Sequence, residues 1–267
     1  MKCKTIAGSG TLDILEAMKG VSLPLFLALS DIRQRYRRST LGPFWISISM
    51  GVMIGCIGLI FGGLFRSPMQ EFLPFLSCGL IIWSLISTVL AEATTSFCSA
   101  EAIIKQLPIP LFTHILRMVA RNLYIFCHNI VILPIVFLIV HKGINWNIIY
   151  FVPALLILIG NLLWMSLLIA VVCTRYRDLT QIVYSLLQIA FYVTPIIWMP
   201  SMLEGRAEKM LLGPNPFYHL IAIVREPLLG QAPEGINWIF SIVFFLCGFI
   251  VTCLFFNKYK QRIAYWL

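Results

Sequence analysis

Residues 31–65, "DIRQRYRRSTLGPFWISISMGVMIGCIGLIFGGLF", place four arginines within six positions directly before a long run of residues without charge. A helix needs about 20 apolar residues to cross the hydrocarbon core of a bilayer. Lys and Arg collect at the cytoplasmic ends of such helices. This stretch therefore predicts a membrane-spanning helix over residues 43–65 with a basic cytoplasmic flank.

The composition of the whole chain extends this prediction. Of its 267 residues, 60% are hydrophobic and 12% are charged, about half the charged fraction of a soluble domain. The net charge of +9 lies at the ends of apolar segments, so we expect no nucleic-acid partner. The first 20 residues lack the continuous apolar run of a cleaved signal peptide, and the first span should itself direct insertion.

Six charge-free runs are long enough to cross a bilayer, and they lack the alternation of an outer-membrane barrel strand. These predicted spans are residues 43–65, 72–91, 122–140, 148–173, 179–198 and 236–256. The fold class is therefore an all-α membrane protein with six transmembrane helices in one domain, 1–267. It divides into a cytoplasmic N-terminus (1–42), a bundle (43–257) and a cytoplasmic tail (258–267). With both termini cytoplasmic, fifteen of the twenty Lys and Arg residues lie inside, as the positive-inside rule requires.

The basic stretch belongs to a predicted amphipathic helix. Leu25, Leu29, Ile32 and Tyr36 recur at helical spacing, and the arginines fall elsewhere around the helix. Such a helix lies in the membrane interface until Gly42 and the following proline turn the chain. The arginines could anchor the chain to lipid phosphates, or they could form a docking surface for an acidic cytoplasmic partner.

The loop between spans two and three, "SAEAIIKQLPIPLF", predicts a short helix over residues 101–107 that ends before two prolines. A rigid knob of this kind suits insertion into the groove of a partner. A plain connecting turn is the alternative.

The first span carries small residues on one face, at Ser47, Gly51, Gly55, Gly58 and Gly62. Small residues in that register let helix backbones approach closely in lipid. We therefore expect helix packing there, with a smooth pore wall as the alternative.

The fifth span carries a polar and aromatic stripe at Gln181, Tyr184, Gln188, Phe191 and Pro195. Amide groups and phenolic hydroxyls are poorly suited to lipid, so this face should contact protein or a wet cavity. Aromatic rings there could stack on sugar rings. Core packing is the alternative.

The long external segment 199–235 contains "NPFYHLIAIVREPLLG". Asn215 can cap a helix that starts at Pro216, and Pro227 and Gly230 can end it. This apolar helix should dip into the outer leaflet or plug a mouth, unless it is an ordinary surface helix.

Several chemistries have no sequence signature here. The spans contain no deep carboxylate, and the chain has no GxxxxGK[ST] phosphate loop and no catalytic cluster. The eight cysteines have no CxxC spacing, so we expect no metal site. Without a catalytic cluster, we also expect no catalytic residues. A chain with docking elements and no ATP site would have to bind a separate ATPase subunit.

Five segments occur in an order that is specific to one family: "RQRYRRSTLGPFW", "AIIKQLPIP", "RYRDL", "YVTPIIWMP" and "NPFYHLIAIVREPLLG". From about residue 24 onward, the chain resembles the permease subunit of type 2 ABC exporters of the polysaccharide branch. That branch includes O-antigen (Wzm-type), capsule and teichoic acid exporters. The ending "QRIAYWL" resembles O-antigen permeases in particular.

The resemblance implies a homodimer in the bacterial inner membrane that moves a lipid-linked polysaccharide, with membrane lipids around it. It also implies two separate ABC ATPase subunits, which bind ATP and Mg, while the permease binds no cofactor and is not an enzyme. Rival functions are capsule or teichoic acid export, drug or lipid export within the same family, and a membrane-embedded enzyme that modifies a glycan or lipid.

The resemblance also implies site residues. An interface helix (23–39), a coupling helix (100–107) and the loop before span five would contact the ATPases, through Arg33, Arg35, Arg37, Arg38, Glu101, Lys105, Arg175, Arg177 and Asp178. Stripe geometry nominates Tyr184, Gln188, Phe191, Tyr192 and Trp198 as glycan contacts in the pore. Re-entrant helices over 214–230 would close the periplasmic mouth, with Asn215, Pro216, Phe217, Arg225 and Glu226 as gate residues.

Overall fold

A computed structural model describes residues 9–37, 42, 44–65, 67–143, 145–202 and 210–267. Every secondary-structure element within these ranges is a helix. The helices before the centre of the chain are α1 (Gly10–Lys19), α2 (Ser22–Arg35), α3 (Phe44–Phe65), α4 (Met69–Ala93), α5 (Ser96–Ser99), α6 (Glu101–Gln106) and α7 (Phe112–Ile130). Those that follow are α8 (Ile132–Ile139), the 3-10 turn η1 (Trp146–Tyr150), α9 (Phe151–Arg175), α10 (Leu179–Val193), η2 (Pro200–Met202), α12 (Pro216–Leu228) and α13 (Gly235–Trp266).

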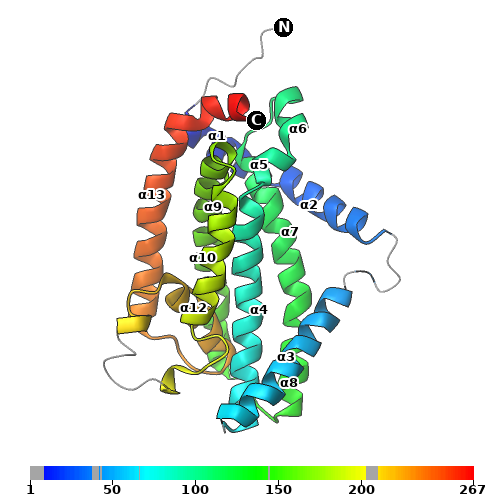
Figure 1. The fold of residues 1–267 in the computed structure, drawn as a ribbon, viewed down its shortest axis with the longest axis vertical. Helices are drawn as coiled ribbons and strands as arrows, with labels where there is room; N and C mark the ends of the chain where they lie inside the picture. Colours follow the sequence, from blue (N-terminus) through cyan, green and yellow to red (C-terminus); the bar gives the residue numbers. More distant parts are fainter. Residues whose placement is uncertain (1–8, 38–41, 43, 66, 144, 203–209) are drawn as a thin grey trace.

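The long helices form one bundle with two distinct ends (Figure 1). The C-terminal end of α13 lies beside α1, α5 and α6, and we call this the terminal end. Helices α8 and α12 lie toward the opposite, distal end. Helix α2 projects sideways from the bundle at the terminal end before the chain enters α3.

Helix α4 is the centre of the bundle and is buried along most of its length. It contacts α3, α7, α8, α9, α10 and α12. The other close pair is α9 and α13, where Asn161 Nδ2 donates to the Ser241 carbonyl oxygen across 3.2 Å. Gly248 makes this approach possible, because a Cβ atom at that position would lie 2.3 Å from the Trp164 ring.

Among the described residues, five helices are long and apolar enough to cross a membrane: Phe44–Phe65, Met69–Ala93, Phe112–Ile139, Trp146–Arg175 and Gly235–Trp266. They correspond to five of the six predicted spans. The remaining predicted span, 179–198, corresponds to α10, whose 15 residues measure about 22 Å at 1.5 Å per residue. That is short of the roughly 30 Å hydrocarbon core, so the six-span count is not confirmed.

Proline explains the early end of α10. The residue before a proline is disfavoured in helical geometry, and Thr194, which precedes Pro195, adopts the extended values φ −85° and ψ 137°. The third long helix differs from prediction at its start. It begins at Phe112, ten residues before the predicted 122, because Arg117 and Arg121 are paired inside the protein instead of lying in a loop.

The predicted small-residue face of α3 has two different environments. Cβ atoms at Gly58 and Gly62 would meet Leu73 and Met69 of α4, each at 2.6 Å. Nothing described lies within 4 Å of a Cβ atom at Gly51 or Gly55. Ser47, at the start of the face, donates to Asn129 Oδ1 of α7 at 3.2 Å. Close packing within the chain therefore involves Ser47, Gly58 and Gly62, and the space beside Gly51 and Gly55 is open.

Candidate functional site

Helix α2 packs against α7 through a narrow buried side formed by Pro24, Ala28 and Ile32. The predicted apolar stripe is buried only at Ile32, because Leu25 and Leu29 are 48% and 42% exposed. The exposed leucines and the exposed arginines thus lie on sides of α2 that do not face the bundle. This arrangement suits a helix in contact with lipid headgroups.

An ion-pair network joins α2 to α4 and α7. Asp31 accepts hydrogen bonds from Arg117 Nε at 2.8 Å and Arg121 Nη1 at 3.1 Å. Arg121 Nη2 also donates to Glu92 Oε2 at 2.7 Å, and Arg35 lies 3.9 Å from the other oxygen of Glu92. Burial raises the pKa of Asp31, but the hydrogen bonds and charges of Arg117 and Arg121 outweigh it and hold that pKa below its ordinary value. The position of α2 is therefore coupled to the core of the bundle.

Charge-free length does not predict this network, because it leaves Arg117 and Arg121 between the second and third predicted spans. Four-residue spacing of the two arginines was the available signal, since it places both on one face of a helix.

Of the predicted docking arginines, Arg33, Arg35 and Arg37 are exposed, and Arg38 lies outside the described residues. Helix α6 has no buried residue. Its Lys105 and Glu101 form an exposed ion pair of 2.6 Å. Helix α6 ends at Gln106, one residue before the predicted end, because Leu107 is extended before a proline.

The end of α9 and the loop before α10 contribute three further predicted docking residues. The Arg175 guanidinium lies 5.2 Å from the centroid of the Tyr176 ring and 5.1 Å from that of Trp266. It therefore joins the end of α9 to the end of α13. Arg177 and Asp178 are exposed. The structure brings all described docking candidates to the terminal end of the bundle or to the adjoining α2 (Figure 1).

Helix α1 supplies a buried carboxylate that no sequence pattern predicted. Asp13 is 1% exposed and accepts hydrogen bonds from the backbone N–H groups of Leu111 and Phe112 at 3.1 and 2.9 Å. Lys260 Nζ of α13 lies 3.2 Å away. Asp13 thus connects α1, the start of α7 and the end of α13. No local sequence pattern reveals contacts across about 100 and 250 residues.

The predicted pore face of α10 is open in the single chain. Tyr184 and Tyr192 are 45% and 63% exposed, and Gln188 is exposed. Phe191 is partly buried against Trp83, with ring centroids 5.9 Å apart. Trp198 Nε1 donates to the Tyr192 carbonyl oxygen at 3.1 Å. An aromatic and amide surface therefore follows one side of α10.

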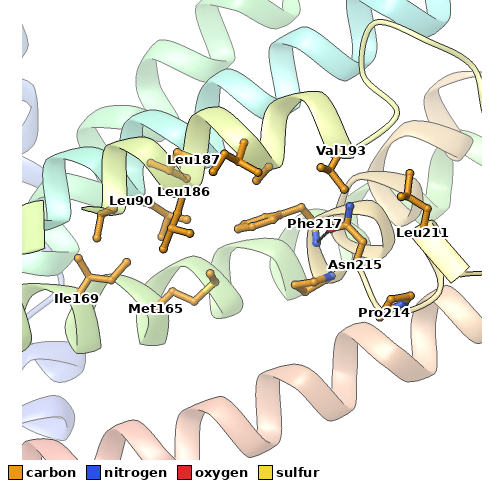
Figure 2. Close-up of a pocket in the computed structure, with 14 residues that line it drawn as sticks. Leu90, Met165, Ile169, Leu186, Leu187, Val193, Leu211, Pro214, Asn215 and Phe217 are labelled. Atoms are coloured by element: carbon orange, nitrogen blue, oxygen red, sulfur yellow. Dashed lines mark hydrogen bonds between the residues drawn. The ribbon is translucent and has the colours of Figure 1, made fainter. Parts of the chain in front are cut away.

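A cavity of about 580 Å³ lies between α10, α9 and α4 and is bounded by α12 at one end (Figure 2). Figure 2 shows Leu186 and Leu187 of α10 across the cavity from Met165 and Ile169 of α9. Asn215 is the one polar residue among the described residues that line it. This apolar cavity lies behind the predicted pore face, and no sequence pattern predicted it.

Helix α12 has the predicted cap and start. Asn215 Oδ1 accepts from the backbone N–H groups of Phe217 and Tyr218 at 3.0 and 3.3 Å, and Pro216 is the first helical residue. Asn215 Nδ2 donates to Thr194 Oγ1 at 3.0 Å, directly after α10. The cap therefore also joins α12 to the end of α10.

Arg225, one of the predicted gate residues, lies on α12 and is directed into the protein. It is 3% exposed, and its Nη1 donates to the Pro195 carbonyl oxygen at 2.8 Å. The guanidinium carbon lies 3.9 Å from the centroid of the Phe75 ring, a favourable cation–π distance. Arg225 is therefore a second link between α12 and the break after α10.

Glu226 lies next to Arg225 and faces the start of α13. It accepts from the Glu234 backbone N–H at 3.3 Å and from Asn237 Nδ2 at 3.4 Å. Burial raises the pKa of Glu226 to about 7, against smaller opposing effects of the Glu234 N–H and the Arg225 charge. Burial between α12 and the start of α13 therefore favours the protonated form of this carboxyl group.

These features define a polytopic α-helical membrane protein with charged elements at one end and a capped, inward-packed helix toward the other. The described residues bring together no group of three or more His, Cys, Asp or Glu side chains that could hold a metal ion. The chain belongs to the ABC-2 type transporter family, whose model matches residues 25–229.

Three curated relatives are similar to nearly the whole chain, and each is named O-antigen export system permease protein RfbA. The one from Myxococcus xanthus is 23% identical over 83% of this chain and 91% of its own length. Two from Klebsiella pneumoniae are 25% and 26% identical, each over 88% of this chain and 90% of the relative.

Proposed function

We propose that this chain is the permease subunit of an ATP-driven exporter that moves a lipid-linked O-antigen polysaccharide across the bacterial inner membrane. The observation that carries the proposal is the similarity to three O-antigen export permeases over more than four fifths of the chain. Membership of the ABC-2 type transporter family supports transport and not catalysis as its activity.

ATP hydrolysis would take place on two separate ABC ATPase subunits at the terminal end, which we assign to the cytoplasm. The exposed arginines of α2 and of the residues just after it, helix α6 without a buried residue, and the exposed Arg177 and Asp178 support this docking surface. The ion-pair network around Asp31 connects α2 to α4 and α7. Movement of the ATPases would therefore reach the helices of the bundle through that network.

The translocation path would form between two copies of the chain. Lipid does not favour the amide and phenol groups that α10 exposes in the single chain, and a pore between two copies would give them a polar environment. Gly51 and Gly55 of α3 have open space beside them, which would let a second copy approach closely. Homodimerisation also follows the usual symmetry of such assemblies.

Helix α12 would close the path at the periplasmic mouth. Its contacts with the break after α10, from Asn215 to Thr194 and from Arg225 to Pro195, support joint movement of α10 and α12. In this proposal α10 and the break after it form the remaining crossing, and α12 lies outside that crossing at the mouth. The remaining gate candidates Pro216, Phe217 and Glu226 lie on the same helix.

The test is export in cells. Deletion of the gene should abolish surface O-antigen, and the wild-type gene should restore it. Charge reversal at the docking surface, Arg37→Glu, should reduce export and recovery of the ATPase with the purified permease. Lys142→Glu, the same charge change in the loop after α8, is the matched control and should leave both unchanged. Normal surface O-antigen in the deletion strain, or loss of a different surface polymer, would refute the assignment.

A further inference from the structure

The apolar cavity behind α10 has the shape of a slot. Its lining residues on α10 run from Val183 to Val193, which spans about 15 Å along a helix. Met165 and Ile169 of α9 face them, and Phe217 lies toward the α12 end (Figure 2). The slot therefore follows the long axis of α10.

The slot leaves α10 weakly held by protein. Leu187 is the only buried residue of α10, and it is still 9% exposed. The residues that line this open space have no protein partner on its open side, so an apolar occupant would add dispersion contacts and stabilise the helix. The walls at α4 and α9 belong to membrane-spanning helices, and the described lining carries no charged group. Hydrocarbon is therefore the chemistry that fits.

Helix α10 presents two chemically opposite sides. Val183, Leu187 and Ala190 line the slot, whereas Tyr184 and Gln188 point to the other side at helical spacing. Phenol rings and amides suit sugar hydroxyls and ring faces. One side of the helix therefore suits a glycan, and the other suits a hydrocarbon chain.

We propose that the slot between α10, α9 and α4 binds the hydrocarbon chain of the lipid that carries the transported glycan. This inference rests on the proposed function, because a lipid-linked glycan is the substrate that combines both chemistries in one molecule. A bilayer phospholipid would match the slot side of α10 alone. Occupation of the slot would complete the packing of α10 while the sugars contact the opposite side.

The test is photocrosslinking of the complete exporter, permease with ATPase, in vesicles of phosphatidylethanolamine and phosphatidylglycerol. One probe is a polyisoprenyl diphosphate with a diazirine in its chain, and the other is phosphatidylethanolamine with a diazirine in an acyl chain. Mass spectrometry of the labelled peptides locates each probe. We expect the diphosphate probe to label the segments around Met165 and Leu187 several-fold more than the acyl probe does.

Val183→Trp fills the slot and should reduce that labelling several-fold. Val251→Trp is the matched control, because Val251 is 56% exposed on α13 and outside the slot, and it should have no effect. Ala190→Leu is a second, smaller filling variant for the case in which Val183→Trp fails to assemble with the ATPase. Equal labelling by both probes, no labelling of the slot, or unchanged labelling in the filled variants would overturn the inference.

Failure of the inference is distinguishable from failure of the proposed function. A wild-type chain that restores surface O-antigen and shows no slot labelling keeps the function and loses the lipid site. A chain that does not restore O-antigen loses the function, whatever labels the slot.

Discussion

Replacement of Asp31 by Asn should loosen α2 from the bundle. The side chains of Asp31, Arg117 and Arg121 are 15%, 24% and 19% exposed. Removal of one partner from a fully buried pair costs about 3–5 kcal/mol, and partial exposure reduces this cost. Asn keeps one acceptor oxygen, so we expect a loss of roughly 2 kcal/mol, which is about 30-fold in the opening equilibrium of α2.

Hydrogen exchange of the α2 amides in the assembled exporter measures this equilibrium. We expect exchange in Asp31→Asn to be about 30-fold faster at pH 7. The control is Glu101→Gln, which removes an exposed ion pair worth about 0.3–0.5 kcal/mol and should change exchange by less than about threefold. Exchange of α2 within threefold of wild type in Asp31→Asn would refute the role of the network.

The same carboxylate predicts an acid dependence with a definite sign. Because the folded-state pKa of Asp31 lies below its ordinary value of 3.8, its stabilisation is present above that value. It is lost as the pH falls through the lower folded-state pKa. The acid-induced part of α2 opening should therefore be smaller in Asp31→Asn than in wild type.

Three further variants test other parts of the structure. Asp13→Asn removes the charge that accepts from two backbone N–H groups and pairs with Lys260. It should lower the free energy of unfolding by about 2–3 kcal/mol. Thermal unfolding in detergent measures this loss. Burial raises the pKa of Glu226 from 4.5 to about 7. The free energy of unfolding of the wild type should therefore fall by about 1–2 kcal/mol as the pH rises between those values. Glu226→Gln should flatten this pH dependence. Gly248→Ala places a Cβ atom 2.3 Å from the Trp164 ring and should lower the free energy of unfolding by about 1–3 kcal/mol. The control Gly63→Ala meets open space and should be neutral or stabilising. Equal melting temperatures for the two variants would contradict the packing of α9 on α13.

Charge-free length predicted the spans well wherever helix ends coincide with charges or turns. The first span was expected at 43–65 and is α3, Phe44–Phe65. Prediction failed where charges are paired inside the protein, as Arg117 and Arg121 are, since composition alone cannot separate a paired arginine from a solvated one. It also failed at the end of α10, where Pro195 ends the helix inside an uninterrupted apolar run.

The candidate site likewise contains features that the sequence predicted and features that it did not. Local patterns predicted the cap at Asn215 and the short helix before Pro108, because both depend on neighbouring residues. The contacts of Asp13 with α7 and α13, and the burial of Arg225 against Pro195, join segments far apart in the chain. Such contacts depend on tertiary packing and leave no periodic signal in the sequence.

The most direct test of the central claim is ATP-dependent movement of a lipid-linked O-antigen in proteoliposomes that contain the purified permease and its ATPase. The account predicts glycan transfer across the membrane only when both proteins and hydrolysable ATP are present, and a strong reduction with Arg37→Glu in the permease. Transfer by the permease alone, or ATP hydrolysis by the complex without any glycan transfer, would contradict it.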